Sequence, residues 1–226
     1  IILAAQDTTD YGIDLYGTRS LPLLLRQICK ISPDIRVRIM YAYMNGITDE
    51  LIEEIASNPQ IYNYLDIPIQ HADDDVLSRM NRSDTVDYID LKISNLRNRI
   101  PDIVLRTTVM VGFPGETDCS FNNLIRQLSA WRFDRLGCFI FSPEENTVAY
   151  SMQNPIDSDT SASRYDEVMT LQQGISLQIN LERVGKVYDV TIDSISEDGI
   201  FYKGRSYAEA PDVDPVIYVL ATEEEL

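Results

Sequence analysis

Apolar and polar residues alternate with two different periods along most of this chain of 226 residues. Short apolar runs predict strands, and apolar residues spaced three or four positions apart predict the helices between them. The predicted strands cover residues 1–5, 36–43, 64–69, 103–111 and 135–141, and the predicted helices cover residues 21–31, 48–57, 74–81, 85–99 and 118–131. Strands that recur about every 30 residues with helices between them indicate right-handed βαβ units and a parallel sheet. Five units are too few to close an eight-stranded barrel, so the pattern predicts an α/β fold that is either a partial, TIM-like barrel or an open sheet.

The pattern changes after Pro155. Residues 156–163 are polar and are interpreted as a linker or a helix entry, and residues 164–183 predict one long helix. Period-two alternation then predicts strands from residue 186 onward, at 200–203 and at 216–220, with a hairpin turn at 197–199. These segments predict a small antiparallel β-barrel of about five strands. We therefore expect a core domain over residues 1–182 and a β domain over residues 183–226.

The net charge of −17 comes from 36 acidic and 19 basic residues, and residues 183–226 alone hold 10 acidic and 4 basic side chains. Binding to a nucleic-acid backbone needs lysine and arginine to replace counterions, so we expect no direct nucleic-acid partner. The charge favours a basic protein as the partner, although simple solubility explains it equally well. No apolar run reaches the length of about 18 residues that a membrane span needs, so we expect no membrane contact and a cytoplasmic protein.

Three further features have simple structural interpretations. Cys29, Cys119 and Cys138 lie far apart without a Cys-x-x-Cys spacing, so the chain predicts no zinc or iron–sulfur motif and no metal ligands of its own. We interpret them as free thiols, with Cys29 in a helix and Cys138 in a strand both buried. The acidic run 73–75 suits the start of a helix better than a metal site. A set of aromatic residues is interpreted as core: Phe113, Trp131, Phe133 and Phe139.

Polar residues follow each predicted strand, and the carboxyl ends of parallel strands meet at one mouth. These residues are Gln6 to Thr9, Tyr41, Tyr43, Gln70, His71, Gly112 to Thr117, Ser142, Glu144 and Glu145. A pocket is therefore expected there, although polar loops are common in any soluble barrel. His71 is the single histidine, and a structural role suits it as well as a catalytic one. Gly112 and Gly115 lack the Gly-Lys-Ser/Thr ending of a P-loop; they either leave bare backbone for a flat ligand such as adenine or form a tight turn.

Three of these segments resemble motifs of the radical S-adenosylmethionine methylthiotransferases. The segments are Gln6 to Thr9 with Tyr11, Gly12 and Asp14 to Gly17; Leu65 to His71 with Leu77 and Met80 to Arg82; and Arg106 to Thr108 through Gly112 to Thr117. The resemblance implies a radical S-adenosylmethionine barrel followed by a TRAM-like β-barrel. It extends over nearly the whole chain.

Within that family, the chain is similar to the RimO type, which modifies an aspartate of ribosomal protein S12. The features that carry this likeness are Gln70-His71 in place of Gln-Ser, Arg132 to Gly137, Ser142-x-Glu144-Glu145 and Gln172 to Ser176. Asn146 departs from the glycine that usually precedes the threonine in this branch. The acidic TRAM-like segment suits a basic ribosomal protein, whereas TRAM modules of the tRNA-modifying branch tend to be basic.

The resemblance implies a mechanism and its cofactors. One [4Fe-4S] cluster would reduce S-adenosylmethionine to a 5'-deoxyadenosyl radical, which abstracts hydrogen from the aspartate β-carbon. A second cluster would deliver a methylated sulfur. The family's C-x3-C-x2-C loop is not found in this sequence, which begins with Ile1 rather than methionine, so we expect a piece of a longer protein that cannot form either cluster alone.

The residues assigned by resemblance are contacts to S-adenosylmethionine. Asp7, Thr8 and Thr9 would hold its amino group; Gln70, His71 and Arg82 would line its carboxylate or the substrate; and Gly112 and Glu116 would flank the adenosine. The catalytic residues themselves are not assigned.

Three other interpretations stay open at this point. One is a tRNA methylthiotransferase, which a basic groove would favour. Another is a catalytically inactive fragment that serves only as a binding module. The third is an ordinary barrel enzyme such as an aldolase, although residues 93–185 contain no lysine that could act at the strand ends.

Overall fold

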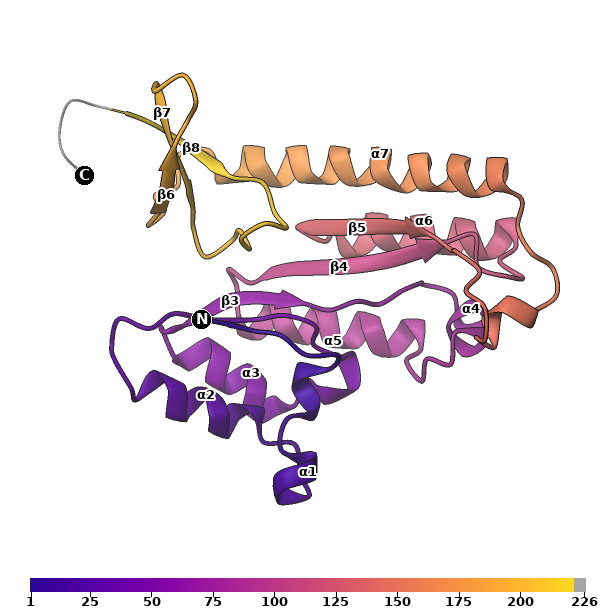
Figure 1. Ribbon diagram of the computed structural model, residues 1–226, viewed down its shortest axis with the longest axis horizontal. Coiled ribbons are helices and arrows are strands. Elements are labelled where there is room, and N and C mark those ends of the chain that lie inside the picture. Colours follow the sequence, from indigo (N-terminus) through magenta and orange to yellow (C-terminus); the bar gives the residue numbers. More distant parts are fainter. Residues whose placement is uncertain (222–226) are drawn as a thin grey trace.

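The computed structural model describes residues 1–221, which form two sheets joined by a long helix (Figure 1). The first sheet has five parallel strands in chain order: β1 (Ile2–Leu3), β2 (Val37–Ile39), β3 (Ile61–Asp66), β4 (Val104–Val111) and β5 (Arg135–Ile140). The second has three antiparallel strands: β6 (Thr191–Ile195), β7 (Phe201–Arg205) and β8 (Ile217–Leu220). The α/β fold with a partial barrel is thereby confirmed, whereas the described part of the second sheet has three strands and not five.

The helices connect consecutive strands of the first sheet, as the sequence predicts, except the last helix, which leads from β5 to the second sheet. They are α1 (Ile13–Tyr16), α2 (Leu21–Cys29), α3 (Asp49–Ser57), α4 (Asp74–Arg79), α5 (Val86–Arg99), α6 (Asp118–Trp131) and α7 (Ser158–Arg183), with 3-10 turns η1 (Thr8–Asp10), η2 (Met44–Gly46) and η3 (Ala149–Ser151). Helix α7 begins six residues earlier than predicted because Asp157 caps it, accepting a bond from the Thr160 amide at 2.8 Å. Even this 26-residue helix lacks the apolar stretch that a membrane span requires, and the same holds for every other helix in residues 1–221.

Threonine side chains fix where several helices begin. Thr48, Thr85 and Thr117 each accept a hydrogen bond from the amide three residues later, at 3.1 to 3.3 Å. Each bond satisfies an amide that has no partner inside its helix. Thr48, Thr85 and Thr117 are therefore the N-cap residues of α3, α5 and α6.

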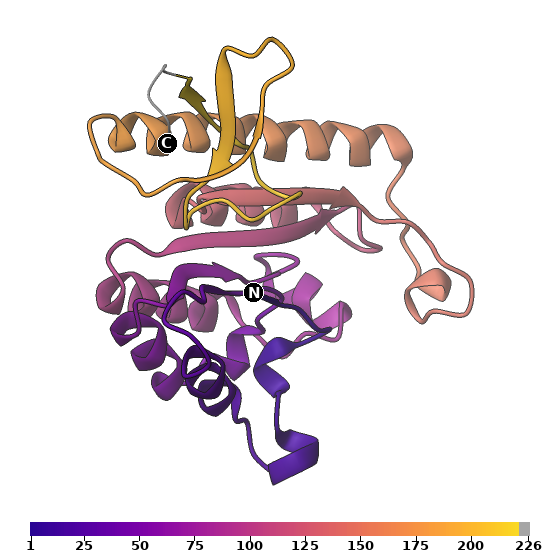
Figure 2. The ribbon, with the colours of Figure 1, turned by 60° about the vertical axis from the view of Figure 1, so that its left-hand side comes forward.

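The helices cover one face of the parallel sheet, which we call the outer face. Along β4, Leu105, Val109 and Val111 are buried in the main core with helix residues such as Leu124. Figure 2 shows α7 along β5 at one edge of the sheet and α2 and α3 toward the opposite edge. The alternate residues of β4 point to the opposite, inner face, as expected for a pleated strand.

Two predicted features of the strands change in the structure. Strand β3 ends at Asp66, and the chain rejoins β4 only through a bridge at Gln70, so Pro68 lies in an irregular stretch where it need not donate to the ladder. The interpretation of Phe139 as core is wrong: its side chain is 60 % exposed. Phe139 lies on the inner face of β5, the last strand of the described sheet, where no helix covers it.

The inner face is covered at the amino ends of the strands by residues 206–214, which connect β7 to β8. We call these residues the floor segment. Ala208 and Ala210 are buried against Met40, Tyr64 and Val104 of the inner face. The C-terminal sheet is thus anchored to the barrel at the end opposite the mouth.

Candidate active site at the mouth of the sheet

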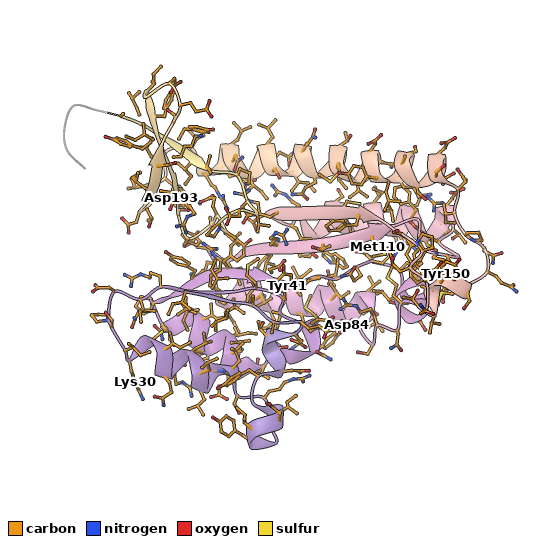
Figure 3. The ribbon with its side chains drawn as sticks, in the orientation of Figure 1. Lys30, Tyr41, Asp84, Met110, Tyr150 and Asp193 are labelled. Atoms are coloured by element: carbon orange, nitrogen blue, oxygen red, sulfur yellow. The ribbon has the colours of Figure 1, made fainter. Side chains whose placement is uncertain are left out.

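A cavity of about 700 Å³ lies at the carboxyl ends of β3, β4 and β5. Its wall includes Gln70, Arg79, Arg82, Met110, Phe113, Phe141 and Met152. Figure 3 shows Met110 and Tyr150 toward this end of the molecule and Asp193 at the other. Two further hollows, of about 360 and 850 Å³, lie near Asp102 and Tyr207 at the amino end. Because ligands of parallel α/β sheets bind at the carboxyl ends of the strands, we take the mouth as the candidate site.

Backbone strain is concentrated around this mouth. Tyr41 after β2, Gln70 after β3 and Asn81 after α4 all have left-handed backbones, with φ of 55°, 69° and 57°. Side chains larger than glycine adopt this conformation at a cost, and such strain persists where the surroundings hold it in place. The strand ends therefore adopt conformations that the fold imposes rather than those the chain prefers.

The turn after β1 holds Asp7, Thr8 and Thr9. Asp7 Oδ1 accepts bonds from the Thr9 amide at 2.8 Å and the Thr9 hydroxyl at 2.5 Å. Thr8 donates its hydroxyl to the Met40 carbonyl at 2.8 Å, and both threonines are buried. The two threonines thus shape the turn, and the second carboxylate oxygen of Asp7 is the part of the turn that is left for a ligand.

Gln70 and Arg82 line the cavity itself. The Arg82 guanidinium lies 4.5 Å from the centre of the Tyr43 ring, a cation–π contact that orients it. Arg79, one helical turn earlier, lines the same wall, and neither arginine forms an ion pair within residues 1–221. No carboxylate lines this cavity, so in a strongly acidic chain the mouth is suited to an anionic group beside an apolar one.

A tight corner follows β4. Gly112 has φ of 75°, and a methyl group on it would overlap the Ser161 hydroxyl. Its amide donates to Glu116 Oε2, and the Arg164 guanidinium of α7 lies 3.6 Å from the same oxygen. Glu116 and Arg164 are both buried, so contacts inside the protein hold this corner in place.

His71 is buried behind the cavity wall. Its side chain is 0 % exposed, and Nε2 lies 3.6 Å from Glu116 Oε1. Neither ring nitrogen has a hydrogen-bond partner in the structure, and neither does Glu116 Oε1. Buried polar atoms without partners are uncommon and need an explanation. The imidazole and the carboxylate therefore face each other beneath the wall, and neither lines the cavity itself.

The predicted site residues therefore fall into three groups. Gln70 and Arg82 line the cavity, Asp7 to Thr9 form a turn at the edge of the mouth, and His71, Gly112 and Glu116 lie beneath the wall. The sequence analysis missed Arg79 and Arg164. Arg79 could have been noticed in the sequence, because it is the last residue of α4 and precedes Arg82 by three positions. Arg164 had no such signal, since it lies 48 residues beyond Glu116.

Within residues 1–221, no three His, Cys, Asp or Glu side chains are placed so that they could hold a metal ion. Cys29 and Cys138 are buried, as predicted, and Cys119 is exposed. Burial, with a smaller contribution from the Glu116 carboxylate, raises the pKa of the Cys138 thiol to about 12. The residues that the structure describes thus fit no [4Fe-4S] cluster, and we derive no chemical step through one.

Comparison with known proteins gives the family. The radical SAM superfamily profile matches residues 1–128, and the TRAM domain profile matches residues 184–225. A Clostridium perfringens protein named ribosomal protein uS12 methylthiotransferase RimO is 47 % identical over 219 residues, covering 97 % of this chain and 49 % of that protein. A protein of the same name from Thermoanaerobacter sp. is 48 % identical over 219 residues, covering 97 % and 50 %. The chain spans about half the length of the curated relatives it matches.

Among solved structures, coproporphyrinogen III oxidase (HemN) from Escherichia coli, a radical SAM enzyme, is similar with a TM-score of 0.57 and 12 % identity. The match covers 89 % of this chain and 56 % of that one. At this identity the likeness shows the fold alone.

Proposed function

This chain belongs to the radical SAM superfamily, and we propose that it is the core and TRAM part of a methylthiotransferase that modifies an aspartate β-carbon of ribosomal protein uS12. The observation that carries the proposal is identity of 43 to 48 % to proteins named RimO over nearly the whole chain. This identity extends across both sheets. We place the division between the two parts at residues 182 and 183, where α7 ends.

The mouth fits S-adenosylmethionine in size and chemistry. A cavity of about 700 Å³ lies within the range of small-molecule sites. When bound, this cofactor supplies the methyl group and the radical chemistry for which the superfamily is named. In the proposed site, the Arg82 guanidinium attracts its carboxylate, with Gln70 beside it, and the rings of Phe113 and Phe141 pack against its adenine. These two rings already meet edge to face, with centroids 5.1 Å apart.

The other assigned residues support this site from its edge and from beneath. We propose that the free Asp7 oxygen accepts from the cofactor ammonium while Thr8 and Thr9 hold the turn. Glu116 fixes the Gly112 amide, and His71 stands behind it, so this corner stays rigid beside the adenosine. Each of these groups would orient the cofactor and exclude water.

The proposed enzyme also needs iron–sulfur clusters and a substrate protein, which these cavity residues do not provide. We place the ligands of the two [4Fe-4S] clusters on a part of the protein outside this sequence. The acidic chain, with residues 183–226 carrying 10 acidic and 4 basic side chains, suits a basic ribosomal protein in the cytoplasm better than nucleic acid.

The test is a product assay on the complete protein, reconstituted anaerobically with iron and sulfide. The protein is incubated with S-adenosylmethionine, a reductant and either a uS12 peptide or tRNA, and mass spectrometry detects an added methylthio group. We expect the group on an aspartate of the peptide. Modification of tRNA alone would overturn the proposal.

A matched pair of variants ties the assay to the mouth. Arg82→Ala removes the cavity arginine and is expected to lower product formation, whereas Arg126→Ala removes an arginine on the outer surface of α6 and is expected to leave it unchanged. Equal loss in both variants would argue against the cavity as the cofactor site.

A further inference from the structure

The floor segment contributes a buried carboxylate to the inside of the barrel. Asp214 side-chain atoms are 2 % exposed, and Asp214 Oδ1 lies 3.7 Å from Arg106 Nε on β4. Burial and the neighbouring Asp214 raise the pKa of Tyr64, so its hydroxyl stays protonated and donates to Asp214 Oδ2 at 2.7 Å. The amide of Ala210 donates to the same oxygen at 2.8 Å, which fixes Asp214 within its own segment.

Arg106 passes this contact on toward the mouth. Its Nη1 donates to Asp66 Oδ1 at 2.9 Å, and the Asp66 side chain is fully buried at the end of β3. The other oxygen of Asp66 accepts from the Tyr41 amide at 3.2 Å. Loss of the Arg106 contact would leave a buried charge without compensation, and loss of the amide would leave a carboxylate oxygen without a partner, so both contacts hold Asp66 in place.

Tyr41 connects this chain of contacts to the turn after β1. Its left-handed backbone, with φ of 55°, is held by Asp66 on its amide side. Its carbonyl accepts from the Thr8 amide at 3.1 Å and from the Thr8 hydroxyl at 3.2 Å. Four polar contacts therefore lead from the floor segment to the turn that holds Asp7, and each has one geometry in the structure.

We propose that Asp214 and Asp66 are positioning residues: through Arg106, the floor segment holds Tyr41 in its strained conformation and thereby fixes the Thr8 turn at the mouth. The C-terminal sheet is then part of the scaffold of the site as well as a surface for a partner. A contact of this turn with S-adenosylmethionine rests on the proposed function, whereas the chain of contacts from Asp214 to the turn does not.

The test measures amide hydrogen exchange in the complete protein by mass spectrometry. Asp214→Asn keeps the shape of the side chain but removes the charge that faces Arg106. We expect exchange in peptides that carry Thr8 and Tyr41 to rise about fivefold, while α6 is unchanged. Asp193→Asn is the matched control, because within residues 1–221 Asp193 pairs only with Arg205 of the same C-terminal sheet, at 2.7 Å.

A double variant checks that the contacts act in series. Asp66→Asn alone is expected to loosen the same peptides, and adding Asp214→Asn to it should cause no further rise. Should Asp214→Asn fold poorly, Tyr64→Phe removes only the hydroxyl that donates to Asp214 and is expected to give the same pattern with a smaller rise.

The outcomes separate this inference from the proposed function. Unchanged exchange at Thr8 and Tyr41 in folded Asp214→Asn protein overturns the inference, whatever the substrate is. If exchange rises, the inference holds, and the dissociation constant of S-adenosylmethionine then tests the cofactor assignment. We expect that constant to rise about fivefold in Asp214→Asn and not in Asp193→Asn; an unchanged constant would remove Asp7 to Thr9 from the cofactor site.

Discussion

The two ends of the five-stranded sheet differ in how the charged and polar side chains near them are paired. At the amino end, Arg38, Arg106, Arg135 and Arg183 each meet an acceptor within 3.2 Å, and most of these acceptors come from the floor segment or from the strand ends, although the Nε atoms of Arg132 and Arg135 are buried without a partner. At the carboxyl end, His71 and Glu116 keep buried atoms without partners, and Arg79 and Arg82 line a cavity without a carboxylate. The backbone strain at Tyr41 and Gln70 also lies at the carboxyl end.

This difference separates stability from function within one sheet. Satisfied buried groups lower the free energy of the folded state, whereas unsatisfied groups and strained backbones raise it and persist where a ligand or a reaction uses them. The amino end is therefore the anchor of the fold, and the carboxyl end is the part that a ligand would complete. Substitutions at the two ends should have different consequences.

The largest effect is expected at the amino end. Arg38 donates to the carbonyl oxygens of Tyr207 and Glu209, both at 2.8 Å, and is 2 % exposed. Arg38→Met leaves these oxygens buried without a donor, so the free energy of unfolding should fall by about 3–5 kcal/mol in urea denaturation. Arg36→Met is the control, because Arg36 is exposed and lies just before β2. It should change the free energy of unfolding by less than about 0.5 kcal/mol. A loss below about 1 kcal/mol for Arg38→Met would remove the anchor role from this end.

Two glycines sharpen the comparison at the mouth. Gly112→Ala places a methyl group against Ser161 in a left-handed backbone, so the free energy of unfolding should fall by about 2–4 kcal/mol. Gly174→Ala adds the same methyl group to α7 with no atom within 4 Å, and should raise that free energy by about 0.5–1 kcal/mol. Thermal unfolding followed by circular dichroism measures both. Shifts of the same sign would contradict the assigned geometry.

Glu116 tests how much the buried corner contributes. Glu116→Gln keeps an oxygen for the Gly112 amide but removes the charge that faces Arg164, so a loss of about 1–3 kcal/mol in the free energy of unfolding is expected. Asp118→Asn removes the other, 94 % exposed partner of the same arginine and should cost less than about 1 kcal/mol. If the two variants lose the same free energy of unfolding in urea, burial of Glu116 does not determine the size of the loss.

The smallest effect is a pH dependence at Cys138. Its native pKa, raised by burial to about 12 from 9.0, means that the folded state holds the proton more tightly than the unfolded state. This contribution is fully present below pH 9 and is lost as the pH rises toward 12. By pH 10 the wild-type protein should lose about 1 kcal/mol relative to Cys138→Ala. Cys119→Ala, at an exposed thiol, should follow the wild-type profile. A difference in unfolding free energy between the wild type and Cys138→Ala that does not change with pH would contradict the expected shift.

Local chemistry explains what could be predicted about the fold. Thr48 and Thr117 mark helix starts because a side-chain oxygen meets an amide three residues away, and this bond depends only on the neighbouring sequence. The period of apolar residues likewise indicated the parallel strands and the helices between them. In a parallel sheet the carboxyl ends of the strands lie at one edge, so the location of the site followed from the order of the elements. Gln70 and Arg82 both line the cavity at that edge.

Only the tertiary structure decided which of those residues meet the cavity and what holds them. His71 and Glu116 follow strands just as Gln70 does, yet they lie beneath the wall, where His71 faces Glu116 and Glu116 is contacted by Arg164, 48 residues further along the chain. Phe139 has the apolar character of a core residue but is exposed because no strand or helix within residues 1–221 covers it. The contact of Arg38 with the floor segment spans 169 residues. Such contacts depend on how distant segments pack, and they leave no period or spacing in the sequence by which to find them.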